Sequence, residues 1–175
     1  LYLASYRLCD MSLCLPLALM PSIFPLMSKF YKHDLATLKL IHQKSFDILS
    51  IFGILLTVLV LALADKIIIK IFGIGFVGSA IALRILILST LLIYLGISSG
   101  NLLLVADRQK TTMWFYVLAA PLSIVLNLIL IPHFSFIGAA ISNNIVMFLI
   151  VSLTFYFVNA KLKISLEITK IKKAA

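Results

Sequence analysis

The sequence predicts an all-α integral membrane protein with about five transmembrane helices. Of its 175 residues, 63% are apolar and 12% are charged, and the mean hydropathy is +1.18. Soluble domains are nearer half apolar and about twice as charged. The apolar segments are long enough for helices rather than barrel strands. The formal net charge of +9 therefore indicates basic loops on one side of a membrane rather than binding to nucleic acid.

The first predicted span covers residues 3–28 and contains three prolines. These are Pro16, Pro21 and Pro25. We expect a kinked or broken helix, because neighbouring helices or water can satisfy the carbonyls that prolines leave free. Arg7 and Asp10 are three residues apart near its start, so their side chains can meet on one helix face. Cys9 and Cys14 are five apart on different faces, which favours packing residues over a disulfide or a metal site.

A polar link at residues 29–44 precedes the second predicted span at residues 46–66. Leucines at helical spacing among four lysines predict a short amphipathic helix that lies along the membrane surface. We expect His33 and His42 to be solvated there rather than to bind a metal. After the second span, the glycines of residues 71–79 predict a turn. They do not match a phosphate-binding loop, because no Lys-Ser/Thr pair follows them.

The third predicted span, residues 83–106, opens with Arg84 and contains a small, polar patch near its end. The patch consists of Gly96, Ser98, Ser99, Gly100 and Asn101. Such patches mediate helix packing more often than they bind ligands, and both interpretations stay open at this stage. A tight polar loop at residues 107–110 follows.

The longest uncharged run predicts a membrane hairpin. Fifty residues between Lys110 and Lys161 contain no Asp, Glu, Lys or Arg. One straight helix of that length would be about 75 Å long, against a hydrocarbon core of about 30 Å. Pro132 and Gly138 flank the single turn-like stretch in the run, which predicts spans at about 112–131 and 137–159. Small residues after Gly138 would let the two backbones pack closely.

The charges predict how the chain lies in the membrane. With five spans, the 29–44 link, the 107–110 loop and the tail at residues 161–175 share one side, with eleven basic residues against four on the other. The positive-inside rule places the first set, and the C-terminus, in the cytoplasm. Residues 161–168 alternate in polarity like a strand, but we expect a basic tail attracted to anionic lipid. The first residues are not a signal peptide, and we expect a piece of a longer protein.

Three stretches of the sequence form a recognisable series of motifs. The first is LYLASYRL at residues 1–8 with SIFPLMS at residues 22–28. The second is IIKIFG at residues 68–73 with AIALRILI at residues 80–87, and the third is NLILIPHFSFIGAA at residues 127–140. In this order and spacing they resemble the polysaccharide and O-antigen flippases of the multidrug/oligosaccharidyl-lipid/polysaccharide exporter superfamily, in which the position of Ser135 is usually Gly. The resemblance covers nearly the whole chain.

The resemblance implies the C-terminal lobe of a roughly twelve-helix transporter in the bacterial cytoplasmic membrane, from its eighth helix onward. It implies translocation of an undecaprenyl-pyrophosphate-linked oligosaccharide by alternating access, not an enzyme. The implied partners are membrane lipid, the lipid-linked glycan and the missing N-terminal lobe, with no nucleic acid. We expect no cofactor, and coupling to protons or sodium ions stays open. The alternative is another exporter of the superfamily, either a cation-coupled multidrug exporter or a lipid II flippase.

Four residues are candidates for binding the substrate: Arg7, Asp10, Arg84 and Asn101. A pyrophosphate-sugar head cannot cross hydrocarbon without a polar path, so cations should line a cavity. The planar guanidinium of Arg7 would suit a phosphate, and Asp10 would fix its rotamer. The alternative for Arg7 is a side chain that reaches to the headgroups, with Asp10 as its counter-ion. We predict no catalytic residue and no metal ligand.

Overall fold

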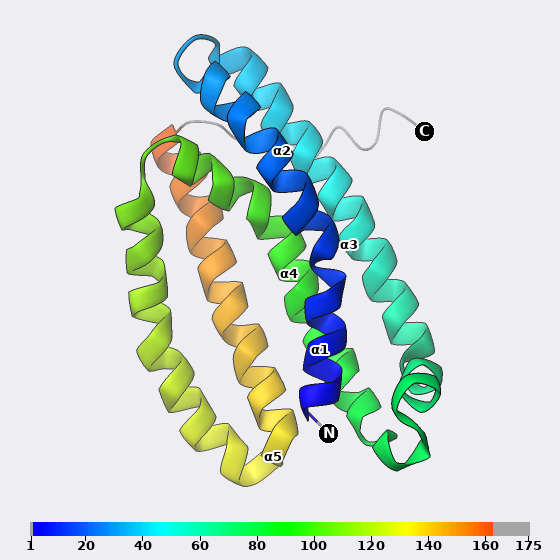
Figure 1. Cartoon of the computed structure of the whole chain (residues 1–175). Coiled ribbons are helices and arrows are strands. Elements are labelled where there is room, and N and C mark those ends of the chain that lie inside the picture. Colours follow the sequence, from blue (N-terminus) through cyan, green and yellow to red (C-terminus); the bar gives the residue numbers. More distant parts are fainter. Residues whose placement is uncertain (1, 163–175) are drawn as a thin grey trace.

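A computed structural model describes residues 2–162, which contain five α-helices, one short 3₁₀-helix and no strand (Figure 1). The helices are α1 (Tyr2–Ser12), α2 (Cys14–Tyr31), α3 (Leu35–Phe72), η1 (Ile74–Phe76), α4 (Ser79–Val105) and α5 (Gln109–Leu162). Four helical stretches in the described residues are long and apolar enough to cross a membrane, with α1 and α2 together forming one of them. The prediction of an all-α membrane protein is therefore supported. The predictions for the tail beyond residue 162 lie outside the described residues.

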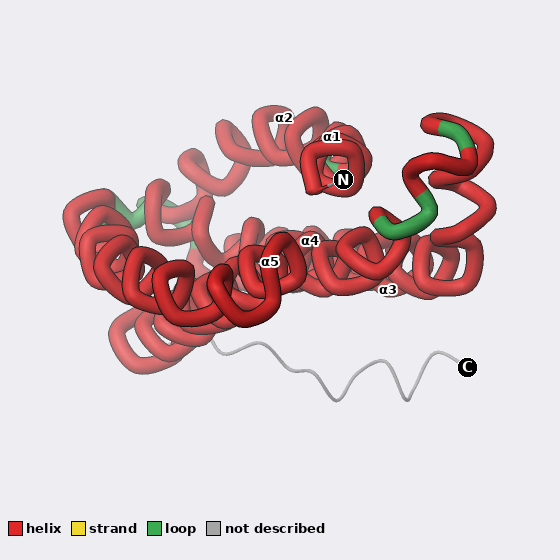
Figure 2. The backbone as a smooth tube through the Cα atoms, turned by 90° about the horizontal axis from the view of Figure 1, so that it is seen from below, coloured by secondary structure: helices red, strands yellow, loops and turns green. Residues whose placement is uncertain are grey.

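Helix α4 is the centre of the fold. Figure 2 shows α3, α4 and α5 in one curved layer, with α1 and α2 against one face of it. Helix α4 contacts α1, α2, α3 and α5. Leu83, Leu86 and Ile87 of α4 are buried in a cluster with Cys9 of α1 and Ile68 of α3. The packing prediction for Cys9 is confirmed.

The polarity of the molecule is distributed as a membrane protein requires. Its buried polar side chains mostly carry small hydroxyl groups, whereas many of its exposed side chains are large and apolar. The buried set includes Ser5, Ser50, Thr57, Ser79, Ser89, Thr90, Ser98, Ser99, Ser142 and Thr154. Many of these hydroxyls donate to a backbone carbonyl one turn earlier, as Ser50 does to Phe46 at 2.6 Å. Small and hydroxylated side chains let helices approach closely in lipid, where apolar surface faces outward at no cost.

The first predicted span is broken, as its prolines indicate. Helix α1 ends at Ser12 and α2 begins at Cys14. Pro16 has no N–H to donate to the carbonyl of Ser12, four residues earlier. The Tyr94 hydroxyl of α4 donates to that carbonyl instead, at 2.5 Å. Pro21 and Pro25, by contrast, lie inside α2 without ending it.

Helix α3 corrects the prediction for the polar link. A separate surface helix at residues 29–44 is wrong, because α3 runs without a break from Leu35 to Phe72. No Pro or Gly interrupts residues 35–52, so nothing in that stretch stops the helix. Asp34 caps the start of α3 by accepting hydrogen bonds from the N–H groups of Ala36 at 2.9 Å and Thr37 at 3.2 Å. The predicted glycine turn is confirmed, since Gly73 ends α3 with a φ of 88°.

The hairpin prediction is confirmed within α5. Ser135 has φ 50° and ψ −131°, and the chain reverses there into two arms (Figure 1). A Cβ on Gly138 would lie 2.3 Å from the carbonyl oxygen of Leu130, so the arms touch backbone to backbone. Ser142 of the second arm donates to Asn127 Oδ1 of the first at 2.6 Å. Ser135 therefore occupies a backbone conformation that glycine adopts more easily. Glycine is also the residue that the resemblance leads us to expect at this position.

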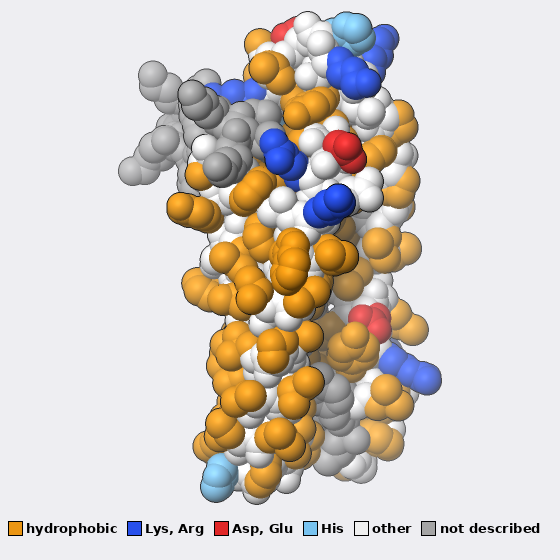
Figure 3. All heavy atoms as spheres, turned by 90° about the vertical axis from the view of Figure 1, so that its left-hand side faces the viewer, with side chains coloured by type: hydrophobic (Ala, Val, Ile, Leu, Met, Phe, Trp, Pro, Cys, Tyr) orange, Lys and Arg blue, Asp and Glu red, His pale blue; other side chains and the backbone are white. Residues whose placement is uncertain are grey.

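The connections fall at two opposite ends of the molecule. The turns near residues 33 and 107 lie at one end, and the glycine turn and the hairpin tip lie at the other (Figure 1). At the first end, α4 closes with a Schellman motif: the N–H of Arg108 bonds to Leu103 O at 2.9 Å and that of Asp107 to Leu104 O at 3.1 Å. The predicted grouping of the 29–44 link with the 107–110 loop agrees with this arrangement. In Figure 3, most Lys and Arg side chains of the α5 face lie in its upper half, with apolar surface below.

Candidate functional site

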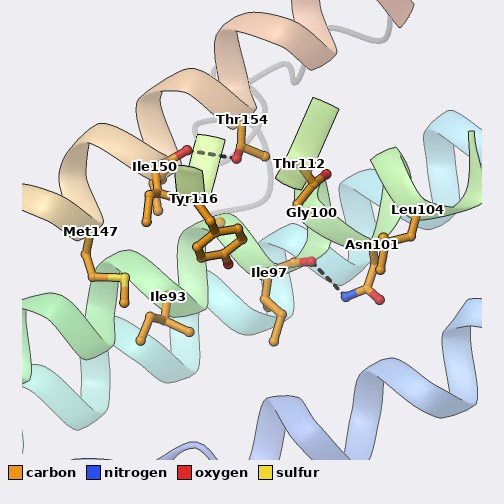
Figure 4. A pocket seen from close by; sticks show the side chains of 12 residues that line it. Ile93, Ile97, Gly100, Asn101, Leu104, Thr112, Tyr116, Met147, Ile150 and Thr154 are labelled. Atoms are coloured by element: carbon orange, nitrogen blue, oxygen red, sulfur yellow. Dashed lines mark hydrogen bonds between the residues drawn. The ribbon is translucent and has the colours of Figure 1, made fainter. Parts of the chain in front are cut away.

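Helix α4 and the α5 hairpin face each other across a pocket. A pocket of about 280 Å³ lies between α4 and both arms of α5. Its lining is shown in Figure 4: Ile93, Gly96, Ile97, Gly100, Asn101, Leu104, Thr112, Tyr116, Met147, Ile150, Val151 and Thr154. A second, more open hollow between α2 and α4 also includes Ile97 and Asn101. The two hollows therefore meet on one face of α4.

Asn101 lies at the junction of these hollows. Its side chain is half-buried, and its Nδ2 donates to the carbonyl of Ile97 at 2.9 Å. Its Oδ1 accepts no hydrogen bond from the described residues, so it can take a donor from a ligand. Of the four candidates, Asn101 is thus the one that the structure places in a pocket.

Arg7 and Asp10 share the face of α1 that is turned away from α4. Ser5 and Cys9 lie on the opposite face of the helix and are buried, with Ser5 Oγ donating to Ser79 O at 2.7 Å. Arg7 and Asp10 are exposed. No ion pair joins them in the described part of the chain, so the contact that their spacing allows is not formed.

Arg84 has a partner that the sequence analysis did not assign. Its Nη2 lies 2.7 Å from Oδ2 of Asp65, and the two side chains are 42% and 53% exposed. The pair joins α3 to α4 beside the glycine turn. Seventeen residues separate Arg84 from Asn101, or about 25 Å along the helix. The candidates therefore form two groups: Arg7, Asp10 and Arg84 near one end of α4, and Asn101 near the other.

His42 was wrongly predicted to be solvated. It is fully buried between α3 and α4, and its Nε2 lies 3.3 Å from Ser99 Oγ. Ser98 Oγ donates to the backbone carbonyl of His42 at 3.3 Å, and His42 Nδ1 has no hydrogen-bond partner among residues 2–162. The signal that could have found it is the spacing of His42 with Leu38 and Leu49, both fully buried on the same face of α3. The polar patch on α4 thus serves helix packing at Ser98 and Ser99 and faces a pocket at Asn101.

Three asparagines of α5 tie the layer together and were not predicted as structural residues. Asn143 Nδ2 donates to Ser89 Oγ at 3.0 Å, and Asn144 Nδ2 donates to Ile85 O at 2.8 Å. Asn127 joins the two arms through Ser142. The bonds of Asn143 and Asn144 fix the register of α5 against α4, and the bond of Asn127 fixes one arm of α5 against the other.

The described residues contain no group of three or more His, Cys, Asp or Glu side chains placed to hold a metal ion. Comparison with protein-family models, with curated proteins and with solved structures finds no match to this chain. The family resemblance therefore rests on the three sequence motifs.

Proposed function

We propose that this chain is part of a membrane transporter that moves a lipid-linked oligosaccharide across the bacterial cytoplasmic membrane. In this proposal each arm of α5 crosses the membrane, which gives five crossings with α1–α2, α3 and α4. The turns near residues 33 and 107 and the C-terminus face the cytoplasm, because they lie with the larger set of basic residues. The three motifs and the hairpin they contain support the assignment to the exporter superfamily.

The observation that carries the proposal is the charged face of α1. Arg7 and Asp10 lie within the first candidate span, exposed and unpaired with each other. A charge at the centre of a bilayer costs at least about 2.5–3.5 kcal/mol, and a charge near the end of a span costs less but is still stabilised by a water-filled cavity or another protein surface relative to lipid. The face of α1 that carries them is opposite the one that packs on α4. A polar translocation path beside α1 accounts for both charges.

This path suits an anionic headgroup. A guanidinium donates two parallel hydrogen bonds to a phosphate, which an ammonium cannot do. Asn101 supplies a second polar group, on a different helix and near the opposite end of the layer. Arg84 is held by Asp65, and we assign it to joining α3 and α4 while its half-exposed guanidinium borders the same end of the molecule. Translocation needs such positioned polar groups and no bond-breaking chemistry.

Substitution of Arg7 in the longer, transport-competent protein tests the proposal. Arg7→Lys keeps the positive charge but cannot donate two parallel hydrogen bonds to a phosphate, and Arg7→Ala loses both the charge and the hydrogen bonds. Since a charged hydrogen bond contributes about 1.5–3 kcal/mol, we expect Arg7→Ala to reduce glycan export by about tenfold or more, and Arg7→Lys to reduce it less. Export is measured in cells at equal membrane abundance of each variant.

Lys66→Ala is the matched control, because Lys66 is an exposed cation on α3 beside the glycine turn. It should export normally. Normal export by Arg7→Ala at normal abundance would show that Arg7 does not contact the substrate, and the side chain would then be a headgroup anchor.

A further inference from the structure

The pocket between α4 and α5 has a polar end and an apolar end. Asn101 lies in the last two turns of α4, and Thr112 lies in the first turn of α5. Thr154 lies about two turns before the end of α5. Ile93 and Met147 lie at the other end of the lining, toward the middle of their helices (Figure 4). The polar end therefore lies beside the turn at residues 106–108. This change from polar to apolar lining matches a lipid whose headgroup lies at the membrane surface and whose hydrocarbon chain lies inside the membrane.

One buried group in the lining lacks a partner. The hydroxyl of Thr112 is out of contact with solvent and forms no hydrogen bond within the described residues. A buried hydroxyl without a partner is unfavourable, because it has lost its hydrogen bonds to water and gained none in return. A ligand with an ester, hydroxyl or phosphate oxygen at the polar end would accept this hydrogen bond. The apolar end of the pocket suits a hydrocarbon chain.

The volume and the charge next to the pocket restrict the ligand further. At about 280 Å³, the pocket is at the lower limit of the range of about 300–1,000 Å³ that is usual for small-molecule sites. It can hold a single chain segment but not an oligosaccharide. Arg108 and Lys110, four and two residues before Thr112, are exposed and form no ion pair among the described residues. They provide positive charge at the polar end.

We propose that the pocket between α4 and α5 binds one hydrocarbon chain of an anionic phospholipid, with the phosphate beside Arg108 and Lys110. The chain lies along Ile97 and Ile150, and Thr112 donates to the glycerol-ester region. The proposal depends on the membrane location of the helices and not on glycan transport, so the two proposals can fail separately.

Gly100 offers a way to fill the pocket without disturbing the fold. A Cβ at Gly100 meets no atom within 4 Å, although Gly100 lines the pocket. Gly100→Leu therefore places a side chain where the lipid chain would lie. Gly75→Leu is the matched control, because a Cβ there is equally unobstructed and lies in η1 at the other end of the molecule.

The chain is purified in detergent and titrated with phosphatidylglycerol, and bound lipid is counted by native mass spectrometry. We expect Gly100→Leu to reduce the lipid-bound fraction at least about tenfold and Gly75→Leu to leave it unchanged, with equal helix content by circular dichroism. If Gly100→Leu loses helix content, Thr112→Val is used, and a threefold or larger loss is expected. Undiminished binding by the folded pocket variant overturns the proposal, and the pocket would then be a packing site for another helix.

The headgroup is tested with phosphatidylcholine as the neutral comparison. The wild-type chain should retain phosphatidylglycerol over phosphatidylcholine. Arg108→Gln with Lys110→Gln should abolish that preference, and Lys66→Gln with Lys70→Gln, which removes the same charge at the opposite end, should keep it. A preference that survives loss of Arg108 and Lys110 overturns the placement of the phosphate.

Discussion

Helix α4 has two long interfaces, and they are packed differently. Against α3 it is sealed: a Cβ on Gly53 would lie 2.9 Å from Tyr94 Cβ, and His42 and Ser99 meet in a fully buried contact. Against α5 it is sealed at one level and open at the next. A Cβ on Gly96 would lie 2.8 Å from a methyl group of Val151, whereas one on Gly100 would meet nothing.

The difference shows that glycine has two roles at the interfaces of α4, at Gly53 of α3 and at Gly100 of α4. At the α3 interface a glycine lets two helices approach, and at Gly100 it leaves room for something that the described chain does not supply. Close approach gains dispersion contacts and is the main attraction between helices in lipid. We therefore assign stability to the α3–α4 interface and ligand binding to the α4–α5 interface.

The largest expected effect comes from closing the space that Gly53 provides. In Gly53→Ala the new Cβ meets Tyr94 Cβ, which is fixed to its backbone and cannot move aside. Overpacking of this kind costs about 1–3 kcal/mol, so the free energy of unfolding should fall by that amount in titrations with sodium dodecyl sulfate. Gly100→Ala, the control at the open interface, should be neutral or stabilising by up to about 1 kcal/mol. Equal losses for both would mean that the two interfaces do not differ.

A smaller effect is expected at the buried polar contact. In a double-mutant cycle of His42→Leu and Ser99→Ala, the coupling energy should be about 0.6 kcal/mol and no more than about 1.7, the range found for hydrogen bonds between membrane helices. The 3.3 Å separation of Nε2 and Oγ favours the lower value. A coupling energy of zero would show that His42 is held by packing alone.

The smallest effect concerns pH at the start of α3. Hydrogen bonds from Thr37 and Ala36 hold the pKa of Asp34 below its ordinary value. Because the folded pKa is the lower one, the cap stabilises the fold fully above about pH 3.9, the unfolded value, and loses this effect as the pH falls through the folded pKa. Asp34→Asn keeps a capping oxygen and does not titrate. Thermal unfolding at pH 7 and pH 3 should therefore show a larger acid-dependent loss of stability in the wild type than in the variant.

The elements predicted well from the sequence are those set by local chemistry. The hairpin followed from Pro132, Gly138 and a run too long for one crossing, and the break in the first span followed from Pro16. These features depend on residues within one or two helical turns of each other. The predicted surface helix at residues 29–44 is wrong because its lysines do not mark a separate element. Lys29 lies in the last turn of α2, Lys32 follows it, and Lys39 and Lys44 lie in the first turns of α3.

The candidate site was less predictable because its contacts join distant residues. The burial of His42 depends on Ser98 and Ser99, more than fifty residues away. The pairing of Arg84 with Asp65 depends on how α3 and α4 turn back on each other. Asn101 and Arg7 were both candidates on chemical grounds, and the predicted topology already placed them on opposite sides of the membrane. No sequence pattern indicated that Asn101 lines a pocket.

The hydrogen bond from Tyr94 to Ser12 also bears on how the chain is made. The two residues are 82 positions apart, so the first span is synthesised long before its missing donor exists. A bare carbonyl in hydrocarbon costs several kcal/mol, and water or another donor must cover it in the meantime. The first span can therefore reach its final dry surroundings only after α4 has been inserted beside it.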